Sequence, residues 1–350
     1  MRRVTTLQQL FGTRLPIVQA PMAGVQASGL AVAVSNAGGL GSLPAALLGL
    51  TDLRRELQAI RQQTDRPFNV NFFCHVQPAF DATRDAAWRN ALAPFCAELG
   101  LDPDAAPTGP GRGTFSAEAT DVIAEFRPPV VSFHFGLPAP ELVQRLRGWG
   151  AKVISSATTV DEARWLEARG VDAVIAQGLE AGGHRGLFLT DDLNTQVGTL
   201  ALVRQVVQAV RVPVIAAGGI ADAAGVRAAL ALGAAGVQVG TAFLLCDEAT
   251  TTALHRRALQ SEAARVTALT NVFTGRPARG IVNRAIRELG PISAAAPAFP
   301  LATGRMAALR AKAEGQGSSD FTPLWAGQNT AGCKAVPAQR VLEELAAGLA

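Results

Sequence analysis

Two of the four histidines in this 350-residue chain occupy positions that favour chemistry. His134 lies near the end of the apolar run PVVSFHFG (129–136), and His184 lies in the glycine-rich stretch EAGGHRG (180–186). Glycines let a ligand approach the backbone closely, and a histidine beside them can donate, accept or transfer a proton. Two histidines at the ends of strands favour a functional site over two structural side chains.

Amide side chains occur on two other apolar runs. Asn69 and Asn71 lie two residues apart on FNVNFFC (68–74), so they face the same way on an extended strand. Gln177 is near the end of DAVIAQG (172–178). An amide both donates and accepts hydrogen bonds, as the polar edge of a flavin ring requires. The pattern leaves two interpretations open, a flavin site or amides satisfied inside a core.

Glycines also mark the ends of the last two apolar runs. The two groups are Gly218-Gly219 and Gln238-Val239-Gly240-Thr241. Glycine lets backbone N–H groups approach a phosphate, and the N-terminus of a following helix adds a favourable dipole. Turns or close packing would explain either group alone. Their occurrence on two successive strands favours a phosphate cradle.

Eight short apolar runs alternate with helix-like segments over the first 245 residues, and these elements must position the residues above. The runs cover residues 15–22, 40–45, 68–74, 129–136, 151–158, 172–178, 212–219 and 235–245. Strands that alternate with helices pair in parallel, and eight such units match a (β/α)8 TIM barrel, whose active site lies at the carboxyl ends of the strands. A doubly wound open sheet is the alternative. Its G-x-G-x-x-G fingerprint is missing, because QAPMAGVQASG has the wrong spacing.

The alternation stops after residue 246. Helices are expected over 249–265, 303–315 and 337–349, and loops over 274–284 and 320–332. We therefore predict three parts: a TIM barrel over 1–246, a mostly helical subdomain over 247–335 that covers the barrel mouth, and a C-terminal helix over 336–350 that packs back on the barrel.

Composition and charge exclude several classes of protein. The net charge is +4, but no basic run exceeds a pair, which argues against a nucleic-acid-binding surface. No stretch has the roughly 20 consecutive apolar residues of a membrane span. The four cysteines are far apart and form no C-x-x-C pair, which is typical of a reducing cytoplasm.

Other chemistries find little support among the residues. The two histidines lack a nearby carboxylate cluster, so no metal site is expected. No G-x-S-x-G motif occurs. Glu180, the only acid of its loop, is either a general base or a structural carboxylate. His75 is expected at the rim of the mouth, and His255 on a solvated helix face.

Six motifs carry a resemblance to a known family. They are QAPMAG (19–24), NVNFF (69–73), SFHFG (132–136), QGLEAGGHRG (177–186), AAGGI (216–220) and QVGTAF (238–243). Together they resemble the first class of nitronate monooxygenases, formerly called 2-nitropropane dioxygenases. The likeness extends from residue 10 to WAGQ at 325–328. Many flavin barrels share AAGGI and QVGTAF, whereas SFHFG together with EAGGHRG is more specific.

The resemblance implies an FMN-dependent TIM barrel that oxidises alkyl nitronates, notably propionate 3-nitronate, with O2. The products would be nitrite and a carbonyl compound, formed through one-electron transfer and an anionic flavin semiquinone. His184 would be the catalytic residue and His134 would bind the anionic substrate. The cofactor-binding residues would be Ala20, Pro21, Met22, Asn71, Gln177, Gly182, Gly183, Gly219, Gln238, Val239, Gly240 and Thr241. Since a nitronate is already deprotonated, His184 is expected to polarise its oxygens rather than act as a base.

Two alternatives remain open from the sequence. Similar barrels include NAD(P)H:quinone reductases and flavin-dependent enoyl-thioester reductases, and rapid flavin reduction by NADH or NADPH would favour them. His134 in SFHFG favours the nitronate class instead. A non-catalytic sensor of FMN or a phosphometabolite would bind its ligand without turnover. For the main hypothesis we expect a small nitronate and O2 as partners, and a cytoplasmic monomer or homodimer.

Overall fold

The computed structural model describes residues 6–105 and 113–349 and confirms the eight predicted parallel strands. Their bounds are β1 Ile17–Gln19, β2 Gly41–Pro44, β3 Phe68–Phe73, β4 Val130–His134, β5 Lys152–Ala157, β6 Ala173–Gln177, β8 Val214–Ala217 and β9 Gly236–Val239. The sheet order is β1-β9-β8-β6-β5-β4-β3-β2. A parallel bridge between Val18 and Leu40 brings its two edges together, so the sheet forms a TIM barrel.

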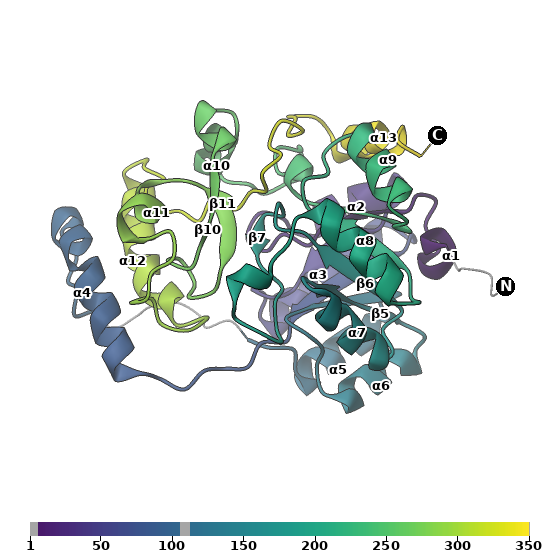
Figure 1. The fold of residues 1–350 in the computed structure, drawn as a ribbon, viewed down its shortest axis with the longest axis horizontal. Coiled ribbons are helices and arrows are strands. Elements are labelled where there is room, and N and C mark those ends of the chain that lie inside the picture. Colours follow the sequence, from purple (N-terminus) through teal and green to yellow (C-terminus); the bar gives the residue numbers. More distant parts are fainter. Residues whose placement is uncertain (1–5, 106–112, 350) are drawn as a thin grey trace.

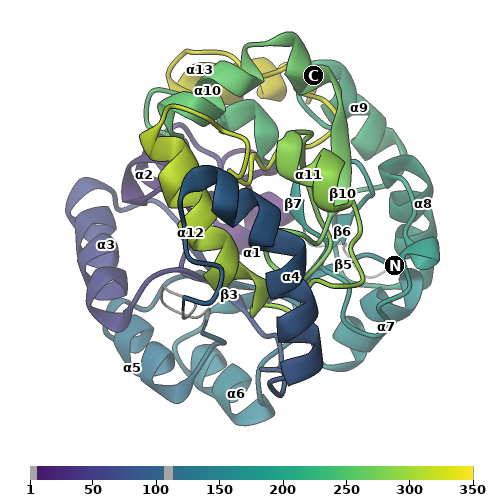
Figure 2. The same ribbon diagram turned by 90° about the vertical axis from the view of Figure 1, so that its left-hand side faces the viewer.

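Helices form a ring around the barrel (Figure 2). They are α2 Ser28–Asn36, α3 Leu50–Gln63, α5 Ala117–Phe126, α6 Pro140–Gly148, α7 Val160–Ala168, α8 Thr199–Ala209, α9 Ala223–Ala231 and α13 Ala338–Ala346. Side-chain caps start several of them; for example, the Ser116 and Thr159 hydroxyls accept from backbone N–H groups of α5 and α7. The strands are buried on both faces, which explains their continuous apolar runs.

Both ends of the chain contribute to the barrel (Figure 1). Helix α1, Leu7–Phe11, buries Leu7 and Phe11 in the cluster that fills the barrel interior. Helix α13 contacts α2 and α9, and its Leu342 and Leu345 join the main core cluster. It therefore takes the place of the eighth barrel helix, after a long excursion of the chain from the end of β9.

That excursion forms a second domain in front of the barrel mouth (Figure 2). It contains α10 Ala253–Leu259, α11 Arg284–Leu289, α12 Ala302–Gly315, β10 Thr267–Thr270 and β11 Ala278–Ile281, and β11 also pairs with β7 Gly183–His184 from the barrel. Short 3-10 turns cover η1 Leu193–Thr195, η2 Thr241–Phe243 and η3 Glu262–Arg265. The domain is thus built around a three-stranded antiparallel sheet as well as helices.

The helix predicted over 249–265 is shorter, because α10 ends at Leu259 and the turn η3 follows it, and two further predictions about individual elements are wrong. The loop predicted over 274–284 contains β11. The eighth strand, predicted over 235–245, ends at Val239, and the 3-10 turn η2 follows it. The segment TGRPARGIVNR has no long apolar run, and its strand exists because both neighbouring strands supply hydrogen-bond partners. The eighth strand is shorter than predicted because the apolar residues after Val239 are buried in a turn and not in a strand.

Helix α4, Ala82–Leu99, lies within residues 1–246 but packs with the second domain (Figure 1). Its buried Trp88, Leu92 and Phe95 share one core cluster with residues of α11 and α12. The partly buried Arg305 of α12 also donates two hydrogen bonds to Asp85 of α4. The domain boundaries at 246 and 335 stay a prediction, and α4 shows that the second domain also draws on an earlier part of the chain.

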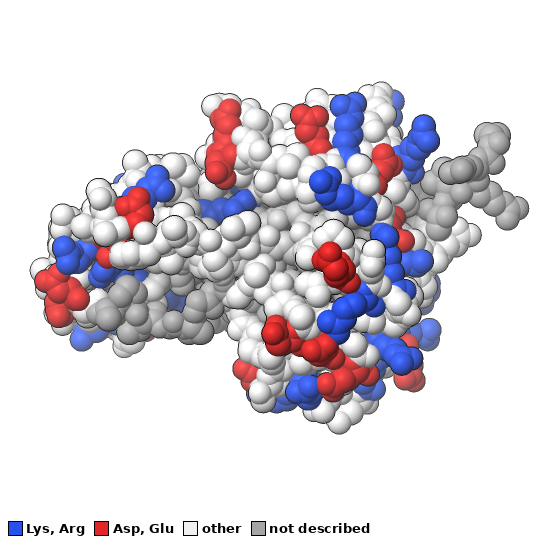
Figure 3. All heavy atoms as spheres, turned by 90° about the horizontal axis from the view of Figure 1, so that it is seen from below, with Lys and Arg blue, Asp and Glu red and all other residues white. Residues whose placement is uncertain are grey.

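One face of the molecule shows an uneven distribution of charge. On this face, charged side chains are spread over the barrel and the far end of the second domain, whereas the surface where the two meet is mostly uncharged (Figure 3). Among the helices of residues 6–105 and 113–349, none has the length and apolar character needed to cross a membrane.

Candidate active site

A cavity lies at the carboxyl ends of the barrel strands, beneath the second domain. The space within it is about 1330 Å³ when the part that is open to solvent is included. The predicted residues that line it are Ala20, Pro21, Met22, Asn71, His134, Gln177, Gly182, Gly183, His184, Gly219, Gln238, Gly240 and Thr241. The structure therefore brings all the predicted site residues together except Val239.

Val239 does not line the cavity. Its side chain is buried in the core cluster between the strands and the surrounding helices. Alternation along β9 explains this placement, because Gln238 points to the opposite face of the sheet and lines the cavity. The Val239 carbonyl accepts a hydrogen bond from the N–H of Ala20 at 2.8 Å, so this residue supports the cavity wall from behind.

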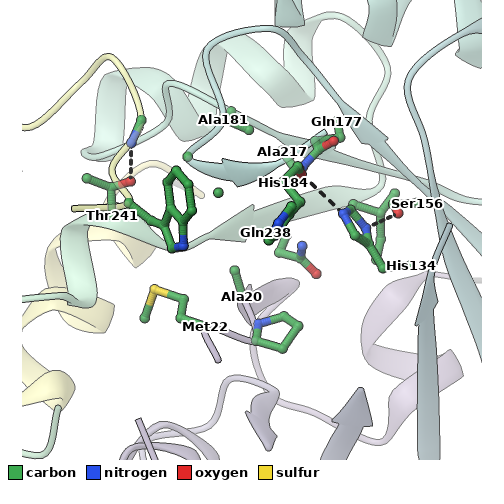
Figure 4. A pocket seen from close by; sticks show the side chains of 18 of the residues that line it. Ala20, Met22, His134, Ser156, Gln177, Ala181, His184, Ala217, Gln238 and Thr241 are labelled. Atoms are coloured by element: carbon green, nitrogen blue, oxygen red, sulfur yellow. Dashed lines mark hydrogen bonds between the residues drawn. The ribbon is translucent and has the colours of Figure 1, made fainter. Parts of the chain in front are cut away.

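The backbone carbonyl of His184 is held by two barrel strands (Figure 4). Gln177 Nε2 of β6 donates to it at 2.9 Å, and His134 Nε2 of β4 donates at 3.1 Å. The Gln177 side chain also accepts from the N–H of Gly186 at 2.8 Å. These bonds fix the His184 backbone relative to the barrel.

The same contacts define the protonation of His134. Burial lowers the pKa of its ring to about 3, so the ring is neutral near pH 7. Because a carbonyl only accepts, the proton lies on Nε2, which faces the His184 carbonyl. Nδ1 then accepts from the hydroxyl of Ser156, with 2.5 Å between Nδ1 and Oγ.

The His184 ring contacts the second domain. Its Nε2 lies 2.9 Å from the hydroxyl oxygen of Thr274. Aromatic rings surround it, with centroids 5.3 Å away at Phe299, 5.6 Å at Trp325 and 6.0 Å at Phe73. The imidazole is therefore enclosed by apolar surface, which strengthens its electrostatic interactions with a bound anion.

Glycine backbones form another wall of the cavity. Gly218 and Gly219 have φ angles of 123° and 72°, in the left-handed region that favours glycine. A Cβ at Gly182 would lie 2.5 Å from the backbone N of Gly327, so the chain can pass there only as glycine. The Gly327 N–H in turn donates to Thr241 Oγ1 at 2.9 Å. The glycine backbone that follows β6 and β8 therefore packs against the 325–329 segment.

Glu180 is a structural carboxylate, one of the two roles the sequence allowed. Its oxygens accept from the backbone N–H of Thr199 at 2.8 and 3.0 Å and from the Thr199 hydroxyl at 2.6 Å. These bonds lie at the N-terminus of α8, where a negative charge is favourable.

Two arginines, one of them buried, lie around the loop that carries His184. Arg185 is fully buried and donates to the carbonyls of Gln177 and Gly178 at 2.8 and 2.6 Å. Burial lowers its pKa to about 10, which still leaves it charged at neutral pH. Arg276 stacks over the ring of Phe135, with 4.2 Å between its guanidinium carbon and the ring centroid. The charges of both arginines help to lower the pKa of His134, and the buried carboxylate of Glu162 interacts with both of them.

The structure buries the two other histidines, which the sequence predicts at the rim of the mouth and on a solvated helix face. His255 is not solvated; it is 3% exposed, and burial lowers its pKa to about 4, although a hydrogen bond to the Trp325 backbone opposes this shift. His75 is also buried, with its ring centroid 4.8 Å from that of Phe299. Both support aromatic residues around the His184 ring.

Sequence reasoning missed several residues of the site. They are Phe73, Ser132, Ser156, Trp325, Ala326, Gly327 and Asn329 in the lining, and Thr274 behind His184. Period-two alternation with His134 would have found Ser132, because both face the barrel interior. No local signal identifies Thr274, since its position depends on how the second domain packs against β7.

Comparisons with known proteins agree with this site. A protein-family model described as nitronate monooxygenase matches residues 4–348. A nitronate monooxygenase of Pseudomonas aeruginosa is 44% identical over 340 residues, which cover 96% of this chain and 97% of that protein. One of Paraburkholderia phytofirmans is 43% identical over 342 residues, covering 97% of this chain and 93% of that protein.

Solved structures share the whole fold. A nitroalkane oxidase from Streptomyces ansochromogenes is 42% identical with a TM-score of 0.89, covering 98% of this chain and 97% of that one. FabK from Thermotoga maritima is 30% identical with a TM-score of 0.73, covering 98% and 95%. The family match, the close relatives and the shared fold show that this chain is an oxidoreductase of the nitronate monooxygenase family.

Proposed function

We propose that this enzyme uses FMN and O2 to oxidise alkyl nitronates, with propionate 3-nitronate as the predicted substrate, to a carbonyl compound and nitrite. Family membership supports nitronate oxidation in general. The observation that carries the finer proposal is the position of His184, whose ring lines a cavity walled by glycine backbone. We place the reaction in the cytoplasm and propose detoxification as its role, in a monomer or homodimer.

The residues of the cavity fit FMN. Gln238 lines the cavity, and its buried Oε1 has no hydrogen-bond partner among the described residues, so a ligand N–H suits it. The cradle of Gly182, Gly219, Gly240 and Thr241 would hold the phosphate, with Gly183 beside it. Asn71, Gln177 and the backbone at Ala20, Pro21 and Met22 would contact the flavin ring. When bound, FMN supplies the one-electron chemistry that an alkyl nitronate requires.

In this proposal, the residues of the chain bind and orient the anion. The His184 ring hydrogen-bonds the nitronate oxygens and polarises the nitro group. His134 carries no charge and both its nitrogens have protein partners, so it binds the substrate by contact and holds the backbone of His184. Arg185 and Arg276 lie close enough to His134 to lower its pKa, and this positive charge would favour an anionic substrate over a neutral nitroalkane.

The aromatic residues around His184 exclude water from the reacting atoms. Phe73 and Trp325 line the cavity, and Phe299 packs on the His184 ring. Water exclusion strengthens the hydrogen bonds between His184 and a developing charge.

Turnover in air tests the proposal. The purified protein, saturated with FMN, is mixed with propionate 3-nitronate while nitrite and dissolved O2 are followed. We expect nitrite to form and O2 to be consumed without any nicotinamide. If neither changes, while NADH plus a quinone or an enoyl thioester is turned over, the proposal is wrong and the reductase alternative holds.

A further inference from the structure

One segment of the second domain, residues 274–279, holds the strand that carries His184. Ala278 of β11 pairs with His184, and Arg279 pairs with Gly183. The N–H of Arg185 donates to the Pro277 carbonyl at 2.8 Å. The backbone around His184 is therefore fixed from the second domain as well as from the barrel.

The same segment reaches the His184 ring through Thr274. The Thr274 hydroxyl oxygen lies 2.9 Å from His184 Nε2 and 3.4 Å from the carbonyl oxygen of Arg276. A threonine hydroxyl can accept from Nε2–H while it donates to that carbonyl, or it can donate to Nε2. Thr274 is 2% exposed, so bulk water does not compete for this bond.

The aromatic neighbours of the ring shape its surroundings without fixing its rotation in the same way. Phe73, Phe299 and Trp325 present aromatic surfaces around the imidazole. Aromatic contacts of this kind accept a range of ring angles. A hydrogen bond to a ring nitrogen, in contrast, selects one direction.

We propose that Thr274 is a positioning residue for His184, which aims the imidazole at the substrate by hydrogen bonding to Nε2. Its kinetic consequence depends on the function proposed above, whereas its structural consequence does not. The second domain then does more than cover the mouth, because it sets the orientation of a ring whose backbone the barrel holds.

The kinetic test uses a nearly isosteric pair of variants. Thr274→Val keeps the side-chain volume and removes the hydroxyl, and Thr274→Ser keeps the hydroxyl and removes a methyl group. We expect Thr274→Val to lower kcat for propionate 3-nitronate about tenfold, the effect of one net hydrogen bond, with KM and bound FMN nearly unchanged. Thr274→Ser should recover most of kcat. Wild-type kcat in Thr274→Val, or an equal loss in both variants, would overturn the proposal.

A spectroscopic test is independent of turnover. The chain has four histidines, so imidazole ¹⁵N–¹H correlation spectra contain few signals, and His184→Asn identifies those of His184. We expect Thr274→Val to shift the His184 nitrogen signals and Thr274→Ser to leave them near their wild-type values. Unchanged His184 signals in Thr274→Val would refute the positioning role. If the wild-type protein forms no nitrite, the proposed function fails, and these spectra still decide the role of Thr274.

Discussion

The barrel and the second domain contribute to the site in different ways. The barrel supplies His134, Gln177 and the glycine cradle from the ends of regular strands, and these residues shape the cavity. The second domain supplies Thr274 and Trp325 from stretches that are ordered by contacts distant in the sequence. Under the two proposals above, the barrel would supply most of the groups that bind the cofactor, while the second domain would close part of the cavity and orient the His184 ring. Variants on the two sides should therefore impair different properties.

The largest effect is expected from His184, where the two regions meet. His184→Asn removes the imidazole and should lower kcat for the nitronate by about 10²-fold or more, because positioned proton donors and acceptors contribute on this scale. FMN binding should persist, since the glycine cradle is untouched. Nitrite formation and the flavin absorbance of the purified variant measure the two properties. Wild-type turnover in this variant would remove His184 from the mechanism.

A change in the barrel cradle should affect binding instead. Gly219→Leu places a side chain on a residue with a φ of 72°, which costs roughly 1–2 kcal/mol, and should weaken FMN retention about tenfold. Gly317→Leu is the matched control, because Gly317 has a φ of 79° and open space around it near the end of α12. FMN titration of both proteins tests this. Equal retention of FMN in the two variants would place the phosphate elsewhere.

The smallest effect is expected within the second domain, away from the cavity. Arg305→Met breaks the pair between α12 and α4 and should lower the free energy of unfolding by about 1 kcal/mol at pH 7. FMN retention should stay unchanged. Urea unfolding measures the stability, and hydrogen exchange should rise in α4 and α12 but not in the barrel. Faster exchange spread evenly over both regions would contradict the assignment of α4 to the second domain.

The effect of this variant depends on pH. Hydrogen bonds from Arg305 lower the pKa of Asp85 below its ordinary value. The stabilisation is therefore present above the ordinary aspartate pKa of about 3.9 and is lost as the pH falls through the lower, folded-state value. The difference between wild type and Arg305→Met should shrink when unfolding is measured at progressively lower pH. A difference that is constant down to strongly acidic pH would show that packing, and not the ion pair, is responsible.

The sequence predicts those parts of the site that rest on local patterns. Strand ends converge in a barrel, and this rule identifies His134, Asn71 and Gln177. The glycine groups are identified because a phosphate binds to accessible backbone N–H groups. The resemblance also implies Val239 as a cofactor-binding residue, but alternation along its strand turns its side chain into the core.

The remaining features depend on pairing and packing between distant segments. β11 is a strand because β7 and β10 flank it, although its own residues are not typical of a strand. A solvated position is expected for His255 on its helix, yet the packing of the second domain buries it beside Trp325. No local pattern of residue types could have placed Thr274 next to His184.

The most direct test of the central claim, that His184 and the glycine cradle form an FMN site for nitronates, is an anaerobic absorbance titration. The FMN-loaded protein is titrated with propionate 3-nitronate, and in a separate cell with NADH. We expect the flavin absorption bands to change promptly with the nitronate and to change slowly or not at all with NADH. Rapid bleaching by NADH with no response to the nitronate would contradict the account, and a protein that takes up no FMN would refute the assignment of the cofactor.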